Sequence, residues 1–309
     1  MAATDIKITG IPSRVELQRP ARSLWKDAWF QFRRHKLAMA GLVTFLFLMV
    51  FTLVGPLVYH TVVNDIDFTM SLKGPSPEHP FGTDDLGRDI LARAMIGGRI
   101  SIAVGITAVL IAITLGLFVG AIAGYFAKLD SPLMRLTDLF LSLPILPLLL
   151  VIVYLFRDTL RAAFGPELGI FLMIVGVIGV LNWMPVARLV RASFLSLKQK
   201  EFVEAARSVG DTDSRIILKH IIPNVLSPVL VAATIGVGGA ILTESTLSFL
   251  GLGFPSDVTT WGRLLYDAKD YIDIAPHWAF FPGMLIFLTV LSINYVGDGL
   301  RDALDPRKG

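Results

Sequence analysis

Six stretches of this 309-residue chain contain no Asp, Glu, Lys or Arg, and they constrain its fold more than any other feature. They cover residues 37–64, 100–127, 139–156, 168–187, 220–243 and 274–297. As a helix with a rise of about 1.5 Å per residue, each stretch is long enough to cross roughly 30 Å of hydrocarbon. Because a bilayer core offers no water to unpaired backbone groups, apolar segments of this length form helices there. We therefore predict an all-α membrane protein with six transmembrane helices.

Composition points the same way. Hydrophobic residues make up 54% of the chain and charged residues 17%, whereas a soluble domain carries about a quarter charged residues. The net charge of +3 does not indicate nucleic-acid binding, because the basic residues lie where membrane orientation requires them. The absence of cysteine excludes a disulfide framework and a thiolate metal site.

Motifs for nucleotide binding and catalysis are also missing from the sequence. It has no G-x-x-x-x-G-K-[ST] phosphate loop, no G-x-S-x-G nucleophile elbow and no H-E-x-x-H zinc motif. Its histidines are scattered through separate segments. We expect no catalytic residue, no metal site and no cofactor bound by this chain.

The distribution of basic residues predicts the orientation. With a cytoplasmic N-terminus, most of the 28 Lys and Arg residues fall on cytoplasmic segments, while the 25 acidic residues divide almost evenly between the two sides. Since positive charge orients membrane helices, we expect both termini and the segment 188–223 in the cytoplasm. The first apolar stretch follows a basic tail, so no cleavable signal peptide is expected.

This topology divides the chain into four parts. We expect a short amphipathic helix on the outer surface just before residue 100, and an interfacial helix in the N-terminal tail, where Trp and Phe alternate with basic residues. The predicted parts are a cytoplasmic tail with that interfacial helix (1–36), a first transmembrane helix and external segment (37–99), a five-helix core that includes the cytoplasmic loop 188–223 (100–298), and a C-terminal cytoplasmic tail (299–309).

A charged island at residues 201–223 separates two apolar stretches. Its first part predicts a short helix with a narrow apolar stripe, because Phe202, Ala205, Ala206 and Val209 have the spacing i, i+3, i+4 and i+7. Glu204 lies on another face of this helix. Gly210 stands where a helix C-cap requires positive φ. A membrane protein with such a helix on its water side presents it to a soluble partner.

Three features of the apolar stretches have more than one interpretation. Gly116, Gly120 and Gly124 recur every four residues and allow close helix contact, either as static packing or as a moving gate. Pro144 and Pro147 interrupt the third stretch, which produces either a simple kink or a part of the substrate path.

Glu244 lies near the outer end of the fifth stretch. A carboxylate beside or within a span is a candidate for function, so Glu244 belongs either to a pathway or gate or to a structural site at the interface.

The charged island resembles the signature of a known family, the permease subunits of binding-protein-dependent ABC importers. The signature is E-A-A, three residues, Gly, then nine residues before I-x-L-P. Glu204, Ala205, Ala206 and Gly210 match it in register, and Pro223 takes the closing position. His220 and Ile222 depart from it, since the family has Ile and Leu there.

Other segments are similar to one branch of that family, the C-type subunit of the dipeptide, oligopeptide and nickel importers. The segments that carry this likeness are His79-Pro80-Phe81-Gly82-Thr83-Asp84, the run from Glu244 to Gly253, Trp261-Gly262, and the tail from Gly297 to Arg307. They occur in the right order, and the resemblance covers the chain from about residue 20 to its end.

The resemblance implies a type I (MetI-like) permease bundle in the plasma membrane of a prokaryote. It implies a heterodimer with a related permease, one or two cytoplasmic ATPase subunits that bind ATP and Mg²⁺, and an extracytoplasmic binding protein. The E-A-A helix would seat in a groove on the ATPase. The implied function is ATP-driven import of di- or oligopeptides; nickel chelates, glutathione or another small solute are alternatives. A different class, an ATP-independent channel or carrier, would transport without an ATPase.

Overall fold

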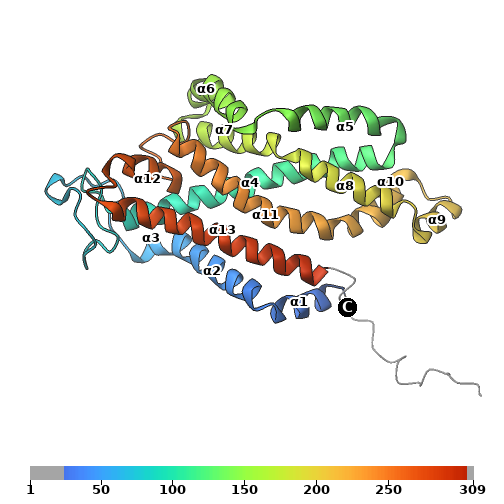
Figure 1. Ribbon diagram of the computed structural model, residues 1–309, viewed down its shortest axis with the longest axis horizontal. Coiled ribbons are helices and arrows are strands. Elements are labelled where there is room, and N and C mark those ends of the chain that lie inside the picture. The colour runs from blue at the N-terminus through green and yellow to red at the C-terminus, as the bar shows by residue number, and fades with distance from the viewer. Residues whose placement is uncertain (1–23, 305–309) are drawn as a thin grey trace, which may run out of the picture.

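The computed structural model describes residues 24–304, and within these residues it is built from helices without a β-sheet (Figure 1). The predicted tail residues 1–23 and 305–309 lie outside the described residues. The main helices are α1 (Leu24–Arg34), α2 (Lys36–Leu53), α3 (Gly55–Val58), α4 (Ile90–Tyr125), α5 (Ala127–Ser142), α6 (Ile145–Phe164), α7 (Pro166–Leu181), α8 (Trp183–Leu197), α9 (Glu201–Ser208), α10 (Asp213–Arg215), α11 (Ile222–Phe249), α12 (Trp261–Ala268) and α13 (Pro276–Leu304). Short 3-10 turns occupy Phe68–Met70 and Lys269–Tyr271, and a π-helix occupies Ile216–Ile221.

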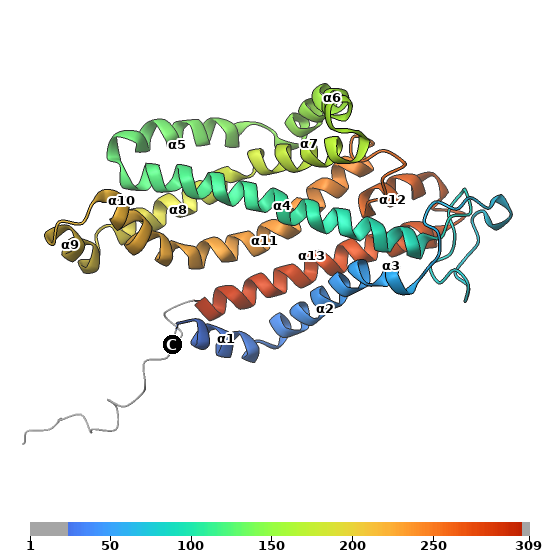
Figure 2. The same ribbon diagram turned by 180° about the vertical axis from the view of Figure 1, so that it is seen from behind.

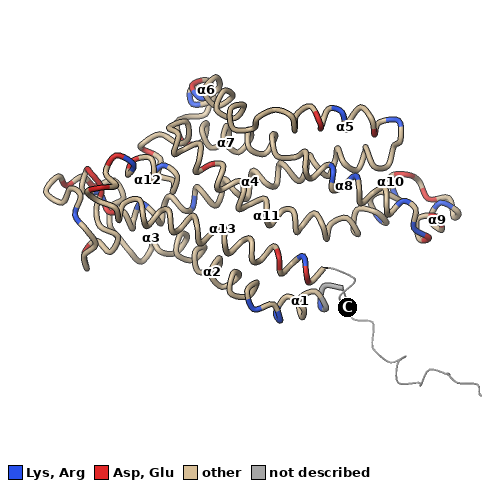
Figure 3. Tube along the Cα trace, viewed as in Figure 1, with Lys and Arg blue, Asp and Glu red and all other residues tan. Residues whose placement is uncertain are grey.

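Five helical segments of the described chain are long and apolar enough to cross a membrane, and a sixth crossing follows if the bent α5–α6 pair is one span. The five are Lys36–Leu53, Ile90–Tyr125, Pro166–Leu197, Asp213–Phe249 and Pro276–Leu304. Charged residues gather at the two ends of the bundle, and few lie in its middle (Figure 3). The predicted all-α fold is confirmed, with five to six candidate spans.

The third predicted span, 139–156, is not a single straight helix. Helices α5 and α6 meet at an angle of 85°, and Leu143 between them is extended with φ −78° and ψ 138°. A residue before proline avoids helical geometry, and proline itself has no N–H to donate. Pro144 therefore ends α5 and becomes the N-cap of α6.

The boundary predicted at residue 99 falls inside a helix, so the separate surface helix expected before it is wrong. Helix α4 begins at Ile90 and runs unbroken for 36 residues. Its start is fixed by Asp89, whose side chain accepts a hydrogen bond of 2.7 Å from the Ala92 amide. Arg93 is completely buried, and it can remain in the helix because Asp84 and Asp267 lie against its guanidinium.

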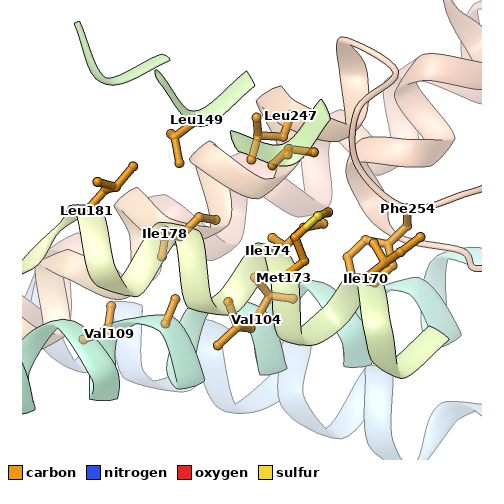
Figure 4. Close-up of a cluster of buried hydrophobic side chains, with 14 of the residues drawn as sticks. Val104, Val109, Leu149, Ile170, Met173, Ile174, Ile178, Leu181, Leu247 and Phe254 are labelled. Atoms are coloured by element: carbon orange, nitrogen blue, oxygen red, sulfur yellow. The ribbon is translucent and has the colours of Figure 1, made fainter. Parts of the chain in front are cut away.

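Helix α4 forms the centre of the bundle. It packs against α7, α8, α11 and α2, while α13 pairs with α2 and α11 on the far side (Figures 1 and 2). The largest apolar cluster among the described residues joins α4 to α7, α6 and α11, and it includes Val104, Ile174, Ile178, Leu149 and Leu247 (Figure 4).

The three spaced glycines of α4 lie against α8. A Cβ added at Gly116 would come within 2.6 Å of Val186, one at Gly120 within 2.5 Å of the Ala187 carbonyl oxygen, and one at Gly124 within 2.5 Å of Phe194. Because glycine has no side chain, the backbones of α4 and α8 approach closely along two turns of α4.

The close approach of α4 and α8 predicts that Gly120→Leu destabilises the chain. Its side chain would overlap the Ala187 backbone and Val190, and overpacking of this kind costs about 1–3 kcal/mol. We expect a lower midpoint of thermal unfolding in detergent, measured by tryptophan fluorescence. The matched control is Gly176→Leu, since a Cβ at Gly176 meets nothing within 4 Å; equal midpoints for the two variants would contradict the packing.

Candidate functional site

Helix α9 and the turn after it form a projecting helical knob at one end of the molecule (Figure 1). The helix ends in a Schellman motif: the Asp211 amide donates to the Ala206 carbonyl oxygen (3.1 Å) and the Gly210 amide donates to that of Arg207 (3.0 Å). Gly210 has φ +85°, the left-handed geometry predicted for it from the sequence. A glycine adopts this conformation without steric cost.

The buried and exposed faces of α9 do not coincide with the apolar stripe predicted from the sequence. Val203 is completely buried and Ala206 is 6% exposed, in a cluster with Ile216, Ile221 and Phe194. The helix is therefore held by apolar contacts to the rest of the chain, and Ala206 belongs to that inner face.

The opposite face of α9 is open. Phe202 is 41% exposed and Val209 82% exposed, and Ala205 and Glu204 are exposed beside them. Of the six residues predicted for coupling, five are exposed and Ala206 is buried; the exposed ones are Phe202, Glu204, Ala205, Val209 and Gly210. The sequence spacing does not reveal the inner face, because Val203 lies beside apolar Phe202 and outside the i, i+3, i+4, i+7 pattern.

Asp211, Arg215 and His220 form an ion-pair cluster at the base of the knob. Asp211 accepts from the Arg215 guanidinium (3.1 Å) and lies 3.3 Å from Nε2 of His220. The hydrogen bond from Arg215, assisted by His220, holds the pKa of Asp211 below its usual range. His220, which departs from the family signature, is therefore the partner of a residue nine positions earlier.

Two interrupted helices face each other across a cavity of about 200 Å³. One interruption lies at Leu143 and Pro144, and the other at Asn182, between α7 and α8. Asn182 uses its side-chain amide to donate to the Ile178 carbonyl oxygen (2.7 Å), which satisfies part of the helix end. Pro147 lies in the first turn of α6, and the cavity is lined by Leu143 and Ile145, the two neighbours of Pro144.

Glu244 is completely buried inside the chain. Its carboxylate accepts from the hydroxyls of Ser248 (2.8 Å), Ser101 (3.2 Å) and Ser245 (3.4 Å). Ser101 also accepts from the backbone amide of Trp261 (3.2 Å). Glu244 therefore connects α11 with α4 and the start of α12, and in this conformation it does not face an open path. Ser101, which belongs to no sequence motif, is the link between the three elements.

The acidic and basic residues of the external segment form ion pairs and caps. Asp84 lies 2.7 Å from Nε of Arg88 and also binds Arg93, and Asp89 accepts from the Tyr59 hydroxyl (2.7 Å). In residues 24–304, no group of three or more His, Asp and Glu side chains is arranged to hold a metal ion.

This fold and its projecting knob define a polytopic transport permease. Residues 112–309, more than half of the chain, match the family described as the inner membrane component of binding-protein-dependent transport systems. Residues 23–75 match the N-terminal transmembrane domain of oligopeptide transport permease C. The chain belongs to the family of binding-protein-dependent inner membrane permeases and is a multi-pass inner-membrane permease of a bacterial ABC importer.

Relatives with named functions are similar over almost the whole chain. The oligopeptide transport system permease protein OppC of Haemophilus influenzae is 44% identical over 94% of this chain and 91% of its own length. The dipeptide transport system permease protein DppC of Alkalihalophilus pseudofirmus is 40% identical over 94% and 93%, respectively.

A solved structure agrees in fold. The MetNI methionine ABC transporter, in an inward-facing conformation, contains a chain that superposes with a TM-score of 0.55 at 20% identity. The match covers 70% of this chain and 96% of that one. The predicted MetI-like bundle is confirmed.

The hydroxyl cluster predicts a stability difference between two substitutions of Glu244. Glu244→Leu leaves the Ser101 and Ser248 hydroxyls without their acceptor, at about 1–3 kcal/mol for each buried group that stays unpaired. Glu244→Gln keeps one acceptor oxygen and should lose less. We expect unfolding midpoints in the order wild type, Gln, Leu, with exposed Glu167→Leu as the control; a Leu variant as stable as wild type would exclude this role.

The ion-pair cluster around Asp211 predicts that the stability of the knob, but not of the rest of the bundle, depends on pH. Because the pKa of Asp211 is lower in the folded state, its pairing stabilises the turn above the usual aspartate range, and this contribution is lost as the pH falls through the lowered pKa. Protection of the amides at residues 210–216 against hydrogen exchange should decrease in acid for the wild type. Asp211→Asn should lack this pH-dependent change, whereas Asp270→Asn, at the other end of the bundle, should retain it.

Proposed function

We propose that this chain is the transmembrane subunit of an ATP-driven importer of di- or oligopeptides. The observation that carries the proposal is the open face of α9, on which Glu204 and Ala205 of the E-A-A motif stand beside exposed Phe202 and Val209. An exposed apolar and charged helix face, fixed from behind by buried Val203, fits a groove on a soluble partner.

The proposed complex contains a second, related permease and one or two cytoplasmic ATPase subunits, which bind ATP and Mg²⁺. An extracytoplasmic binding protein delivers the substrate. The oligopeptide and dipeptide functions named for the relatives support a peptide substrate here. We place the knob and both termini in the cytoplasm, where the excess of Lys and Arg supports that orientation.

In this mechanism α9 is a handle rather than a catalytic element. Closure of the ATPases on ATP displaces α9, and its apolar inner face carries the displacement to α8 and to the start of α11. The permease pair then favours an outward-open state, and hydrolysis returns it inward. The ATP-bound motor shifts the population because it binds one state more tightly.

The cavity between the two helix interruptions supports a place for Pro144 and Pro147 beside the substrate path. Irregular backbone at membrane depth is tolerated where protein or a water-filled cavity satisfies it. Glu244 has a different role in this proposal: it holds the outer ends of α4 and α11 together while the path opens next to them.

Reversal of one charge on the handle tests the proposal. Glu204→Lys should abolish ATP-dependent uptake of labelled dipeptide by vesicles that contain the whole complex, by at least about 100-fold if a desolvated pair of about 3 kcal/mol is lost. The chain should still insert and unfold at the wild-type temperature. Glu167→Lys, an exposed charge reversal away from α9, should transport normally.

Two results would contradict the proposal. The first is full ATP-dependent uptake by Glu204→Lys. The second is uptake by this chain alone in liposomes without an ATPase, which would identify a channel or secondary carrier.

A further inference from the structure

Helix α1 has one exposed face on which cations and aromatic rings alternate. Its inner face consists of Ala28 and Phe32, which are both 7% exposed. On the opposite side, Trp29 and Phe30 are 53% and 49% exposed. The exposed cations of that side complete a set that we term the basic aromatic face: Lys26, Trp29, Phe30, Arg33 and Arg34.

The positive charges of this face have no ion-pair partner among the side chains that the structure describes. No ion pair between described side chains includes Lys26, Arg33 or Arg34. The Arg34 guanidinium instead lies over the Phe30 ring, 4.2 Å from its centroid. A stacked guanidinium keeps its outer N–H groups free for a phosphate or carboxylate.

The face stands at the boundary of the hydrophobic layer. Only His35 separates α1 from α2, the first helix long and apolar enough to span the membrane. The outer surface of α2 is apolar, with Leu37 54%, Val43 62% and Phe47 65% exposed. Figures 1 and 3 show α1 at the end of the α2–α13 pair that lies towards α9, with its basic residues in that position. Tryptophan and arginine at such a level meet lipid headgroups.

We propose that the basic aromatic face is a binding site for anionic phospholipid headgroups. Arg33 and Arg34 bind the phosphates, and the rings of Trp29 and Phe30 insert at the level of the glycerol and upper acyl chains. Two facts select this occupant: the face is purely cationic among its described charges, and it is continuous with an apolar helix surface of the kind that faces acyl chains.

The bound lipid would act on the transport bundle through direct packing. Ala28 and Phe32 belong to the same apolar cluster as Ala38 and Ala303, so α1 holds the first turn of α2 against the end of α13. A Cβ added at Gly299 of α13 would lie 2.1 Å from that of Ala38. A headgroup bound on the outer side of α1 thus stabilises the contact between the start of α2 and the end of α13.

The test measures lipid affinity on the purified whole complex. Phosphatidylglycerol or, as neutral reference, phosphatidylcholine is titrated against the complex in mild detergent, and bound lipid is counted by native mass spectrometry. Arg33→Gln/Arg34→Gln should weaken phosphatidylglycerol binding by on the order of tenfold or more, since each basic residue near an anionic surface contributes about a fivefold change. Arg33→Lys/Arg34→Lys should retain most of the preference.

The matched control removes two other exposed cations, as Lys128→Gln/Arg135→Gln on α5, and should bind phosphatidylglycerol like the wild type. The proposal is overturned if the wild type does not prefer phosphatidylglycerol, if the control loses as much affinity, or if the Arg33/Arg34 glutamine variant keeps its preference. Loss of the ATPase from that variant with lipid preference intact would assign the face to a protein contact instead. Should the double variant fail to assemble, Arg34→Gln alone decides, with an expected loss of about fivefold.

Discussion

The unbroken course of α4 is the constraint on which the rest of the bundle depends. A helix of 36 residues is about 54 Å long at 1.5 Å per residue, more than the hydrocarbon layer requires, so its outer turns must carry polar groups. Arg93 would be expensive to bury alone, and Asp84 and Asp267 make its position acceptable. Because α4 continues through this ion pair, it can contact the external loops at one end and the base of the knob at the other.

The contacts of α4 at the end near α9 support the coupling role that we propose for α9. The Tyr125 hydroxyl donates to Asp213, and the Gly124 carbonyl oxygen accepts from Lys198 (3.0 Å). Both partners flank the knob, one on each side of α9. The knob is thus fixed to the central helix as well as to α8 and α11, and a force on α9 reaches the bundle through packed and hydrogen-bonded contacts rather than through a loose loop.

Much of this arrangement was predictable from the sequence, and the failures have physical causes. Charge-free stretches identify spans because hydrocarbon excludes charge, and Gly210 identifies the turn because its φ is positive. The unbroken α4 was missed because Arg93 interrupts the apolar pattern, and part of its compensation comes from Asp267, 174 positions away. The inner face of α9 was missed because burial of Val203 depends on Ile216 and Ile221 folding back. The spacing of apolar residues in the sequence does not show which later segments fold back and pack against a helix.

Helix α11 connects the two regions for which separate roles were inferred. It begins next to the π-helix at Ile216–Ile221, where Pro223 has no amide hydrogen to donate, and it ends shortly after Glu244. A π-helix and a proline weaken the axial hydrogen-bond ladder, so bending should concentrate at the inner end of α11. The outer end is the opposite case, since Glu244 accepts from the Ser101 hydroxyl of α4, which itself accepts from the Trp261 amide of α12. A displacement of α9 would therefore reach the flexible inner end of α11 before it reaches the outer end, which the hydrogen bonds of Glu244 fix. In the proposed mechanism, the helix between them is a lever whose outer pivot is the Glu244 cluster.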